Sequence, residues 1–300
     1  ITGVRGDYYY IFRDYAFSPR LAMTANAGNA GIFSISGGIF YQPRSEFSGF
    51  MEEYFLTNPS RNSSNCENIN FYDLELQRNF QAELGYEKQF KKLHSFSLEL
   101  YHKYYDCEYP FVNPDDKAYF DPSPTSPNKT RLKKPHGIKK VFGLELILQK
   151  KKFDAFYYSL AYSLTSVKNK YTNGKYYTDK NDFQNVFSCV LGSNFFRHHG
   201  LSTRFTAMEG RPYCKMVIVT QGNETKVIYN PSVDYFSERF EPIFLLSARY
   251  NFKLYNKRSN FTGYVEVINI LNREPVISRE LDESSGEFDY ITMNGIVPLI

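Results

Sequence analysis

The feature that most constrains the fold is a strict two-residue alternation of apolar and polar side chains. In the stretch Leu93–Asp106, LHSFSLELYHKYYD, the residues Phe96, Leu98 and Leu100 fall on one parity, and the residues between them are polar or charged. A period of two is typical of a β-strand that has one apolar face and one polar face. Such alternation recurs along the 300 residues and predicts eleven strands, at roughly 1–10, 16–26, 31–43, 79–90, 94–107, 137–150, 154–167, 183–196, 200–213, 242–254 and 260–271, with room for a twelfth beginning near Val297.

The lengths of the connections indicate which medium lies against the apolar face. Alternate links are short, such as Lys150–Phe153, whereas the links between them are mostly long: 44–78, 108–136, 168–182, 214–241 and 272–290. A transmembrane β-barrel separates its loops in this way, with short periplasmic turns and longer extracellular loops. Strands of about ten to fourteen residues also suit a tilted membrane span. We therefore predict an all-β, antiparallel up-and-down transmembrane β-barrel, with the apolar parity against lipid and the polar parity in a wet lumen.

Composition agrees with this fold and argues against other classes of protein. The chain has 27 Phe and 26 Tyr and no Trp; both favour strands, and Tyr suits a membrane–water boundary. The net charge of +4 is small and evenly scattered, which argues against a nucleic-acid binder. The sequence contains no window of eighteen apolar residues, so no transmembrane helix is predicted. A soluble all-β domain rich in tyrosine remains an alternative on composition alone.

Eight short motifs are spread over nearly the whole chain, each of them weak alone: Gly3–Asp7, Phe17–Ala22, Gly38–Pro43, Leu84–Glu87, Leu98–Tyr104, Gly143–Leu146, Glu209–Tyr213 and Tyr264–Asn272. Their order and spacing resemble the C-terminal barrel of TonB-dependent outer-membrane receptors. Such barrels have about 22 strands. The resemblance therefore implies that residues 1–300 form the C-terminal half of a barrel, an incomplete barrel of about 11–12 strands without the plug domain. The ending Pro298–Ile300 departs from the family, whose last strand is expected just beyond it.

The resemblance implies active import across the outer membrane of a Gram-negative bacterium. A substrate would bind in the extracellular loops and the barrel mouth, and an N-terminal plug inside the barrel would be remodelled by the TonB energy-coupling complex. The implied partners are outer-membrane lipid, the plug, TonB and a small-molecule or oligosaccharide substrate: an iron–siderophore, a cobalamin or an oligosaccharide. No nucleic acid, cofactor or catalytic role is expected. The alternatives are a plugless porin or channel and, with less support, an outer-membrane hydrolase, for which His136 is the histidine beside a long loop.

Two sets of site residues follow. Aromatic and arginine side chains dominate binding surfaces, so the predicted substrate-binding residues at the outer rim are Tyr41, Gln42, Arg44, Tyr105, Arg211 and Tyr213. A plugged lumen needs polar partners for its plug, so the predicted lumen and plug-contacting residues are Arg20, Glu83, Glu99, Glu145, Arg204, Arg249 and Glu266.

The four cysteines do not indicate a metal site. No pair among them has the CxxC spacing, which argues against a zinc site; they are Cys66, Cys107, Cys189 and Cys214. Cys66 and Cys107 are expected on the same side of the barrel, where a disulfide and two free thiols are both compatible with the sequence.

Overall fold

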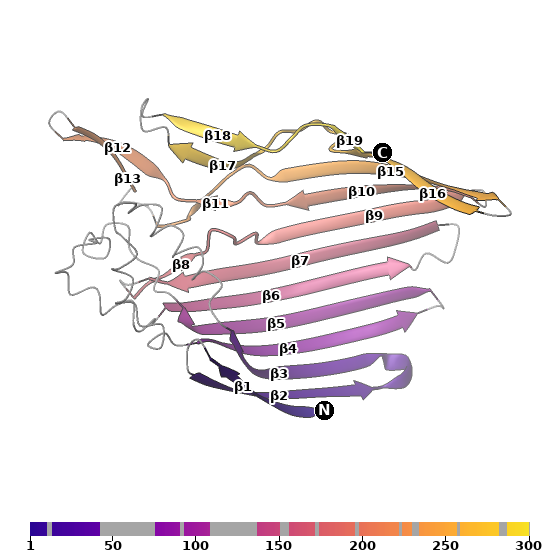
Figure 1. Ribbon diagram of the computed structural model, residues 1–300, viewed down its shortest axis with the longest axis horizontal. Helices are drawn as coiled ribbons and strands as arrows, with labels where there is room; N and C mark the ends of the chain where they lie inside the picture. The colour runs from indigo at the N-terminus through magenta and orange to yellow at the C-terminus, as the bar shows by residue number, and fades with distance from the viewer. Residues whose placement is uncertain are drawn as a thin grey trace.

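The structure is a computed structural model, and it describes residues 1–10, 14–42, 76–90, 93–108, 137–150, 156–171, 174–195, 198–221, 224–229, 234–256, 259–281 and 287–299. Within these ranges the chain forms one large antiparallel sheet (Figure 1). Among the same residues, no helix is both long and apolar enough to cross a membrane.

The large sheet runs in the order β1-β2-β3-β4-β5-β6-β7-β9-β10-β15-β16-β19, so consecutive long strands are neighbours. Its strands are β1 (Thr2–Tyr9), β2 (Asp14–Asn26), β3 (Ile32–Gln42), β4 (Gln77–Phe90), β5 (His94–Glu108), β6 (Gly137–Lys150), β7 (Phe156–Lys170), β9 (Asn185–Phe195), β10 (His199–Met208), β15 (Ile243–Asn256), β16 (Ser259–Ile268) and β19 (Val297–Leu299), with β8 (Tyr176–Thr178) paired to the end of β7. All eleven predicted strands are present, and the twelfth begins at Val297 as expected.

Shorter elements extend the sheet at the end that carries the long links. They are the pair β11 (Pro212–Tyr213) and β14 (Glu238–Arg239), the hairpin β12 (Met216–Gln221) and β13 (Glu224–Tyr229), and the hairpin β17 (Val276–Leu281) and β18 (Phe288–Thr292). The alternation predicted none of them as a separate strand; Pro212–Tyr213 was expected at the end of the strand 200–213, which in the structure ends at Met208. At the opposite end, one 3₁₀ turn, η1 (Gly28–Ala30), joins β2 to β3.

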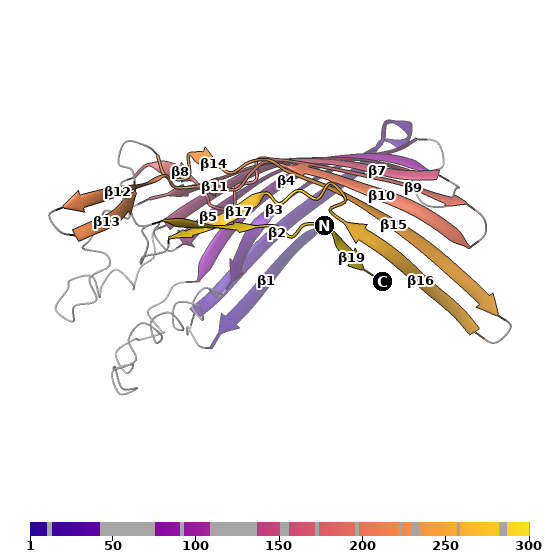
Figure 2. The same ribbon diagram turned by 90° about the horizontal axis from the view of Figure 1, so that it is seen from above.

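Seen from above, the sheet bends and twists into an arch (Figure 2). In the strand order, β1 and β19 are the two ends of the sheet and are not neighbours. The predicted fold class is therefore confirmed, and the barrel is incomplete among the described residues, as expected.

Side-chain exposure identifies the two faces of the arch, because a curved sheet crowds the side chains on its concave face. The polar side chains Ser18, Asn79 and Asn169 are 2%, 6% and 2% exposed, and all lie on the polar parity. Large apolar side chains of the other parity are open, including Phe17 at 63% and Leu84 at 52%. The polar parity is therefore the concave face, and the apolar parity is the convex face that the sequence assigns to lipid.

The convex face of β6 has the dimensions of a membrane band. Its convex residues read Lys140, Phe142, Leu144, Leu146, Leu148 and Lys150. From one lysine to the other the strand rises roughly 33 Å at about 3.3 Å per residue. At the tilt of about 40° typical of barrels, that rise spans roughly 25 Å, the usual height of the apolar band. The band is thus bounded by a lysine at each end.

The register with β7 decides the faces of β9, which the sequence left unassigned because both parities are apolar. Phe187, Cys189 and Leu191 pair directly with Tyr162, Leu160 and Tyr158 of the convex row. Val186, Ser188 and Val190 consequently lie on the concave face.

Two glycines of the concave face make room for tyrosine rings on the neighbouring strands. A Cβ added to Gly143 would lie 2.2 Å from the Tyr101 ring, and one added to Gly192 would lie 2.1 Å from the Tyr157 ring. Each ring therefore lies across the backbone of the adjacent strand, where only glycine leaves enough space.

Candidate ligand-binding site at the loop end

The loop end of the sheet carries most of the predicted rim residues. Gln42 ends β3 and hydrogen-bonds through its side-chain amide to Gln77 of β4. Tyr105 lies near the end of β5 on the concave parity, opposite Asn79. Tyr41 pairs with Arg78, and this pair has the convex parity. Arg44 lies outside the described residues, as do Cys66 and His136.

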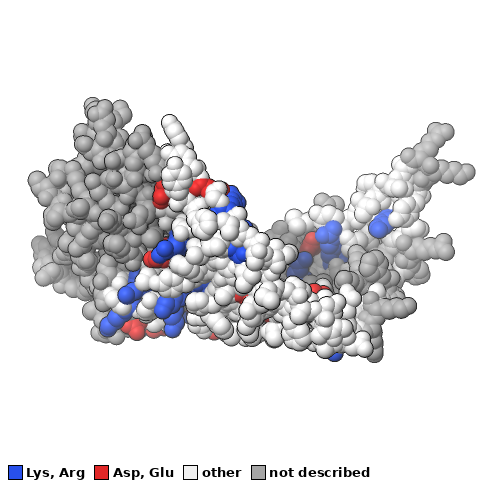
Figure 3. Space-filling view, turned by 90° about the horizontal axis from the view of Figure 1, so that it is seen from below, with Lys and Arg blue, Asp and Glu red and all other residues white. Residues whose placement is uncertain are grey.

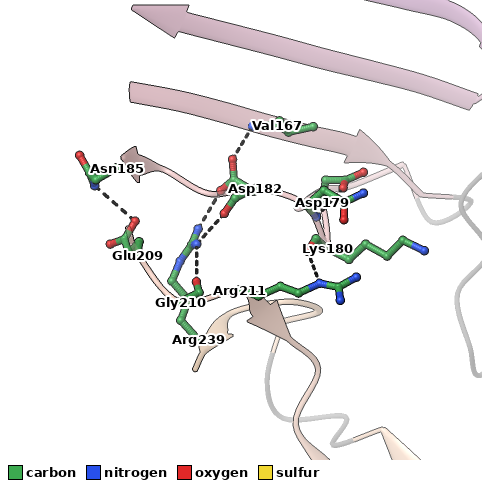
Figure 4. A network of polar contacts seen from close by, with 10 residues as sticks. Val167, Asp179, Lys180, Asp182, Asn185, Glu209, Gly210, Arg211 and Arg239 are labelled. Carbon is green, nitrogen blue, oxygen red and sulfur yellow. Dashed lines mark hydrogen bonds and ion pairs between the residues drawn. The ribbon is translucent and has the colours of Figure 1, made fainter. Parts of the chain in front are cut away.

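A buried carboxylate ties three segments of the loop end together (Figure 4). The Asp182 side chain is 1% exposed and accepts a hydrogen bond from the backbone N–H of Val167 at 2.7 Å. Arg239 forms an ion pair with this carboxylate at 2.7 Å and donates to the carbonyl oxygens of Asp182 and Gly210. The edge of β7, the segment before β9 and strand β14 are thereby held together by one satisfied charge pair. We call Asp182 and Arg239, with these partners, the Asp182 clamp.

A second carboxylate anchors the same segment to the concave end of β6 and β7. Asp179 is 6% exposed and accepts hydrogen bonds from the Asn169 side-chain amide and the Asn181 backbone N–H. Lys139 of β6 lies 4.0 Å from it. The turn that contains Asp179 and Asp182 is therefore fixed at both of its acidic residues.

The segment Gly210–Tyr213, which carries two predicted rim residues, is held by the clamp and by its own backbone. A Cβ added to Gly210 would lie 1.8 Å from the carbonyl oxygen of Phe240, so only glycine allows the two chain segments to come this close. Arg211 Nε donates to the carbonyl oxygen of Lys180 at 3.1 Å. Arg211 is thereby oriented from two sides, by its own main chain and by the Asp179–Asp182 turn.

Arg211 and Tyr213 line a cavity of about 210 Å³ between β11, β14 and the hairpin β17–β18. The Arg279 guanidinium lies 4.3 Å from the centroid of the Tyr213 ring and 4.4 Å from that of Phe288, and it donates to the Cys214 carbonyl oxygen. Lys180 is a third basic residue of the lining, and among the described residues that line the cavity none is acidic. Aromatic walls and basic groups suit a ligand that is partly apolar and carries negative charge.

Cys214 also lines this cavity, and its thiol is buried. Burial raises the pKa of the Cys214 thiol, against smaller lowering contributions from a backbone hydrogen bond and from Arg279. The neutral thiol is therefore favoured near neutral pH, and it contributes apolar surface rather than a nucleophile. Cys189 and Cys214 are free thiols.

All seven predicted lumen residues lie on the concave face, and the hollow of the molecule contains charged side chains of both signs (Figure 3). Glu99 and Glu145 are direct cross-strand partners, and Glu83 accepts a hydrogen bond from Ser36 at 3.0 Å. Across the sheet, Arg249 lies 3.8 Å from the Glu266 carboxylate. Arg204 pairs with Val190 and Ser247, and the Arg20 guanidinium lies 4.4 Å from the centroid of the Phe40 ring.

Sequence reasoning missed four residues of the loop end: Asp179, Asp182, Arg239 and Arg279. Each lies within or beside a long link, where no alternation marks its direction. The run Asp179–Asp182 offers two acids three residues apart, but nothing in it shows that an arginine 57 positions later is the partner. Among the described residues, no group of three or more His, Cys, Asp or Glu side chains could hold a metal ion.

The curved antiparallel sheet, polar on its concave face and apolar on its convex face, has the architecture of outer-membrane β-barrel receptors and transporters. Among solved structures, the ferric-catecholate import receptor Fiu of Escherichia coli K12 is similar over 94% of this chain and 34% of its own, at 14% identity and a TM-score of 0.58. The E. coli outer-membrane transporter YddB is similar over 99% and 42%, at 11% identity and a TM-score of 0.64. The outer-membrane ferripyoverdine receptor of Pseudomonas aeruginosa, bound to ferripyoverdine, is similar over 94% of this chain and 32% of its own, at 12% identity and a TM-score of 0.60.

No protein-family model and no curated protein sequence matches the chain. The chain spans between about a third and two fifths of the length of the solved structures described above. The predicted resemblance is confirmed at the level of the fold, because this chain folds like part of the barrel of these outer-membrane receptors and transporters. The neighbours are outer-membrane receptors and transporters rather than enzymes.

Proposed function

We propose that this chain is the C-terminal half of the barrel of an outer-membrane receptor that binds a scarce solute and imports it with energy from the TonB system. The observation that carries the proposal is the basic and aromatic cavity at the loop end of a barrel wall whose concave face is polar. The proposal is also supported by the fold that this chain shares with a receptor described as importing ferric catecholate and with one bound to ferripyoverdine. The proposed location is the bacterial outer membrane, with lipid against the convex face.

Within this proposal the substrate is an iron–siderophore, ahead of a cobalamin or an oligosaccharide. Arg211 and Tyr213 are the proposed substrate contacts, because both line the cavity. Gln42 and Tyr105 are proposed as further contacts at the rim, and Arg44 completes the proposed set. Tyr41 was predicted with them, but it has the convex parity and is left out of the proposed contacts. No catalytic role and no cofactor are part of the proposal.

The double substitution Arg211→Ala and Tyr213→Ala is expected to reduce uptake of the cognate iron chelate about tenfold or more, because arginine and tyrosine are enriched among the few residues of a binding site whose truncation costs more than about 1 kcal/mol each. Radiolabelled iron uptake in a strain that expresses the full-length protein measures the effect. The matched control is Tyr255→Ala, which should leave uptake unchanged. Tyr255 is an exposed aromatic residue near the short-turn end of β15.

The same strain separates the alternatives. Uptake that persists without the TonB complex would indicate a plugless porin. Growth with and without the gene would be compared under iron limitation, under cobalamin limitation and with a glycan as the sole carbon source. Equal growth in all three conditions would contradict the receptor proposal.

We further propose that the seven lumen residues contact the plug. Glu99 and Glu145 pair directly across β5 and β6, and like charges directly opposite each other destabilise a sheet. A basic side chain of the plug between them would turn this repulsion into two charge-assisted hydrogen bonds.

The double substitution Glu99→Gln and Glu145→Gln should therefore lower the stability of the full-length protein by about 1.5–3 kcal/mol, the usual contribution of hydrogen bonds to charged groups. Denaturant unfolding in detergent measures it, with Ser97→Ala as the control on the same face. In a plugless barrel the same change would only relieve repulsion, so a midpoint that rises or stays constant would refute the plug contact.

A further inference from the structure

The convex face carries a group of lysines at the loop end that neither the cavity nor the lumen uses. Lys140 of β6 and Lys168 of β7 are direct cross-strand partners, and both are exposed. Lys170 lies two residues further along the same face of β7 and pairs with Tyr176 of β8. The Lys140 ammonium lies 4.6 Å from the centroid of the Tyr176 ring. We call Lys140, Lys168, Lys170 and Tyr176 the basic patch.

The basic patch has an excess of positive charge. Lysines directly opposite each other on one face repel and destabilise the sheet. On the convex face of the neighbouring strand β5, Asp106 carries a negative charge, and it forms an ion pair with Arg78. Lys139, which precedes Lys140 in β6, points to the concave face and lies near Asp179. The Asp179 carboxylate is therefore a counter-charge on the concave side of the sheet. A counter-charge from outside the sheet would remove the repulsion.

The height of the basic patch on the barrel indicates the source of that counter-charge. Lys140 lies next to Phe142, at the loop-side end of the apolar convex row Phe142–Leu148, and Lys168 lies on the loop side of Leu164 on the adjacent strand. These lysines therefore mark the edge of the apolar band on the side of the long loops. Lipid headgroups occupy this level, and tyrosine is enriched there.

We propose that the basic patch binds the phosphate group of an anionic lipid in the leaflet at the loop end, with the acyl chains of that lipid along Phe142, Leu144 and Leu164. The proposal depends on the membrane placement in the proposed function and is independent of the imported solute. Lysine ammonium groups bind phosphate as point charges, and basic pockets between membrane-spanning segments bind lipid headgroups in this way.

The test is binding of phosphatidic acid to the full-length protein in neutral detergent, followed by native mass spectrometry at low ionic strength. The triple substitution Lys140→Gln, Lys168→Gln and Lys170→Gln should weaken binding about tenfold or more, because each lysine near an anionic headgroup contributes roughly fivefold. The control Lys88→Gln, Lys150→Gln and Lys253→Gln removes the same charge at the short-turn end and should change binding by less than about twofold on the same reasoning. Phosphatidylcholine should bind all three proteins equally.

An unchanged affinity in the triple variant, or an equal loss in the control, would overturn the proposal. Competition by inorganic phosphate alone at concentrations comparable to the lipid would assign the patch to a free anion and overturn the lipid as its source. If the triple variant does not fold, Lys168→Gln alone decides the question, with an expected loss of roughly fivefold. Iron uptake can fail in its own assay without affecting this result, which separates the two proposals.

Discussion

Replacing Asp182 with Ala is expected to destabilise the loop end by about 3–5 kcal/mol, the usual cost of removing one partner from a buried ion pair. The substitution leaves the Arg239 guanidinium without its carboxylate and the Val167 N–H without its acceptor. Hydrogen exchange should show it: amide protection in 174–185 and 234–242 should fall by roughly two to four orders of magnitude. The centre of the barrel wall should keep its protection.

Two comparisons make this expectation specific to the Asp182 clamp. Asp182→Asn keeps an oxygen that can accept from Val167 and loses only the charge, so it should cost less than Asp182→Ala. Asp7→Ala breaks the Arg5–Asp7 pair, in which the arginine side chain is 64% exposed, and should cost less than about 1 kcal/mol. If Asp182→Ala has no larger effect than Asp7→Ala, the clamp does not hold the loop end.

The clamp also matters for ligand binding, because Arg239 contacts Gly210 and Arg211 follows it directly. Asp182→Ala should therefore weaken substrate binding although Asp182 does not line the cavity. This would be an effect on the position of Arg211 rather than a lost contact.

Replacing Leu146 with Arg is expected to cost about 2–4 kcal/mol of the stability of the inserted barrel, as found for arginine at the lipid-facing midplane of barrels. Leu146 lies near the centre of the convex row that Lys140 and Lys150 bound. The control is the next residue, Ile147, which points to the concave face; Ile147→Arg should cost much less. Refolding of the full-length protein into lipid vesicles, with its urea midpoint, measures both.

The order of these two effects tests the assignment of the faces. A larger penalty at Ile147 than at Leu146 would mean that the convex residues meet water or another protein surface instead of lipid. Equal penalties would also contradict the lipid assignment, because a membrane barrel has one face that tolerates charge and one that does not.

The long strands could be predicted from the sequence because a strand repeats every two residues. That local rule located β4, β5 and β6 within two residues of their observed starts, and it separated Leu98 from Glu99 correctly. The rule failed at β9, where both parities are apolar, and the faces there follow from the pairing of Leu160 with Cys189. It also did not predict that Pro212–Tyr213 forms a separate strand, β11, paired with β14, because this pairing depends on contact between distant segments.

By itself the sequence determined the all-β class, the long strands, the two faces of these strands except in β9, and the concave placement of residues such as Glu99 and Arg249. Periodicity carries this information, since each side chain's direction follows from its position in its own strand. Only the tertiary structure decided the loop end: the partnership of Asp182 with Arg239, the cavity around Arg279, and the opposition of Lys140 to Lys168. These arrangements depend on register and on contacts between segments far apart in the chain, and alternation within a segment contains neither.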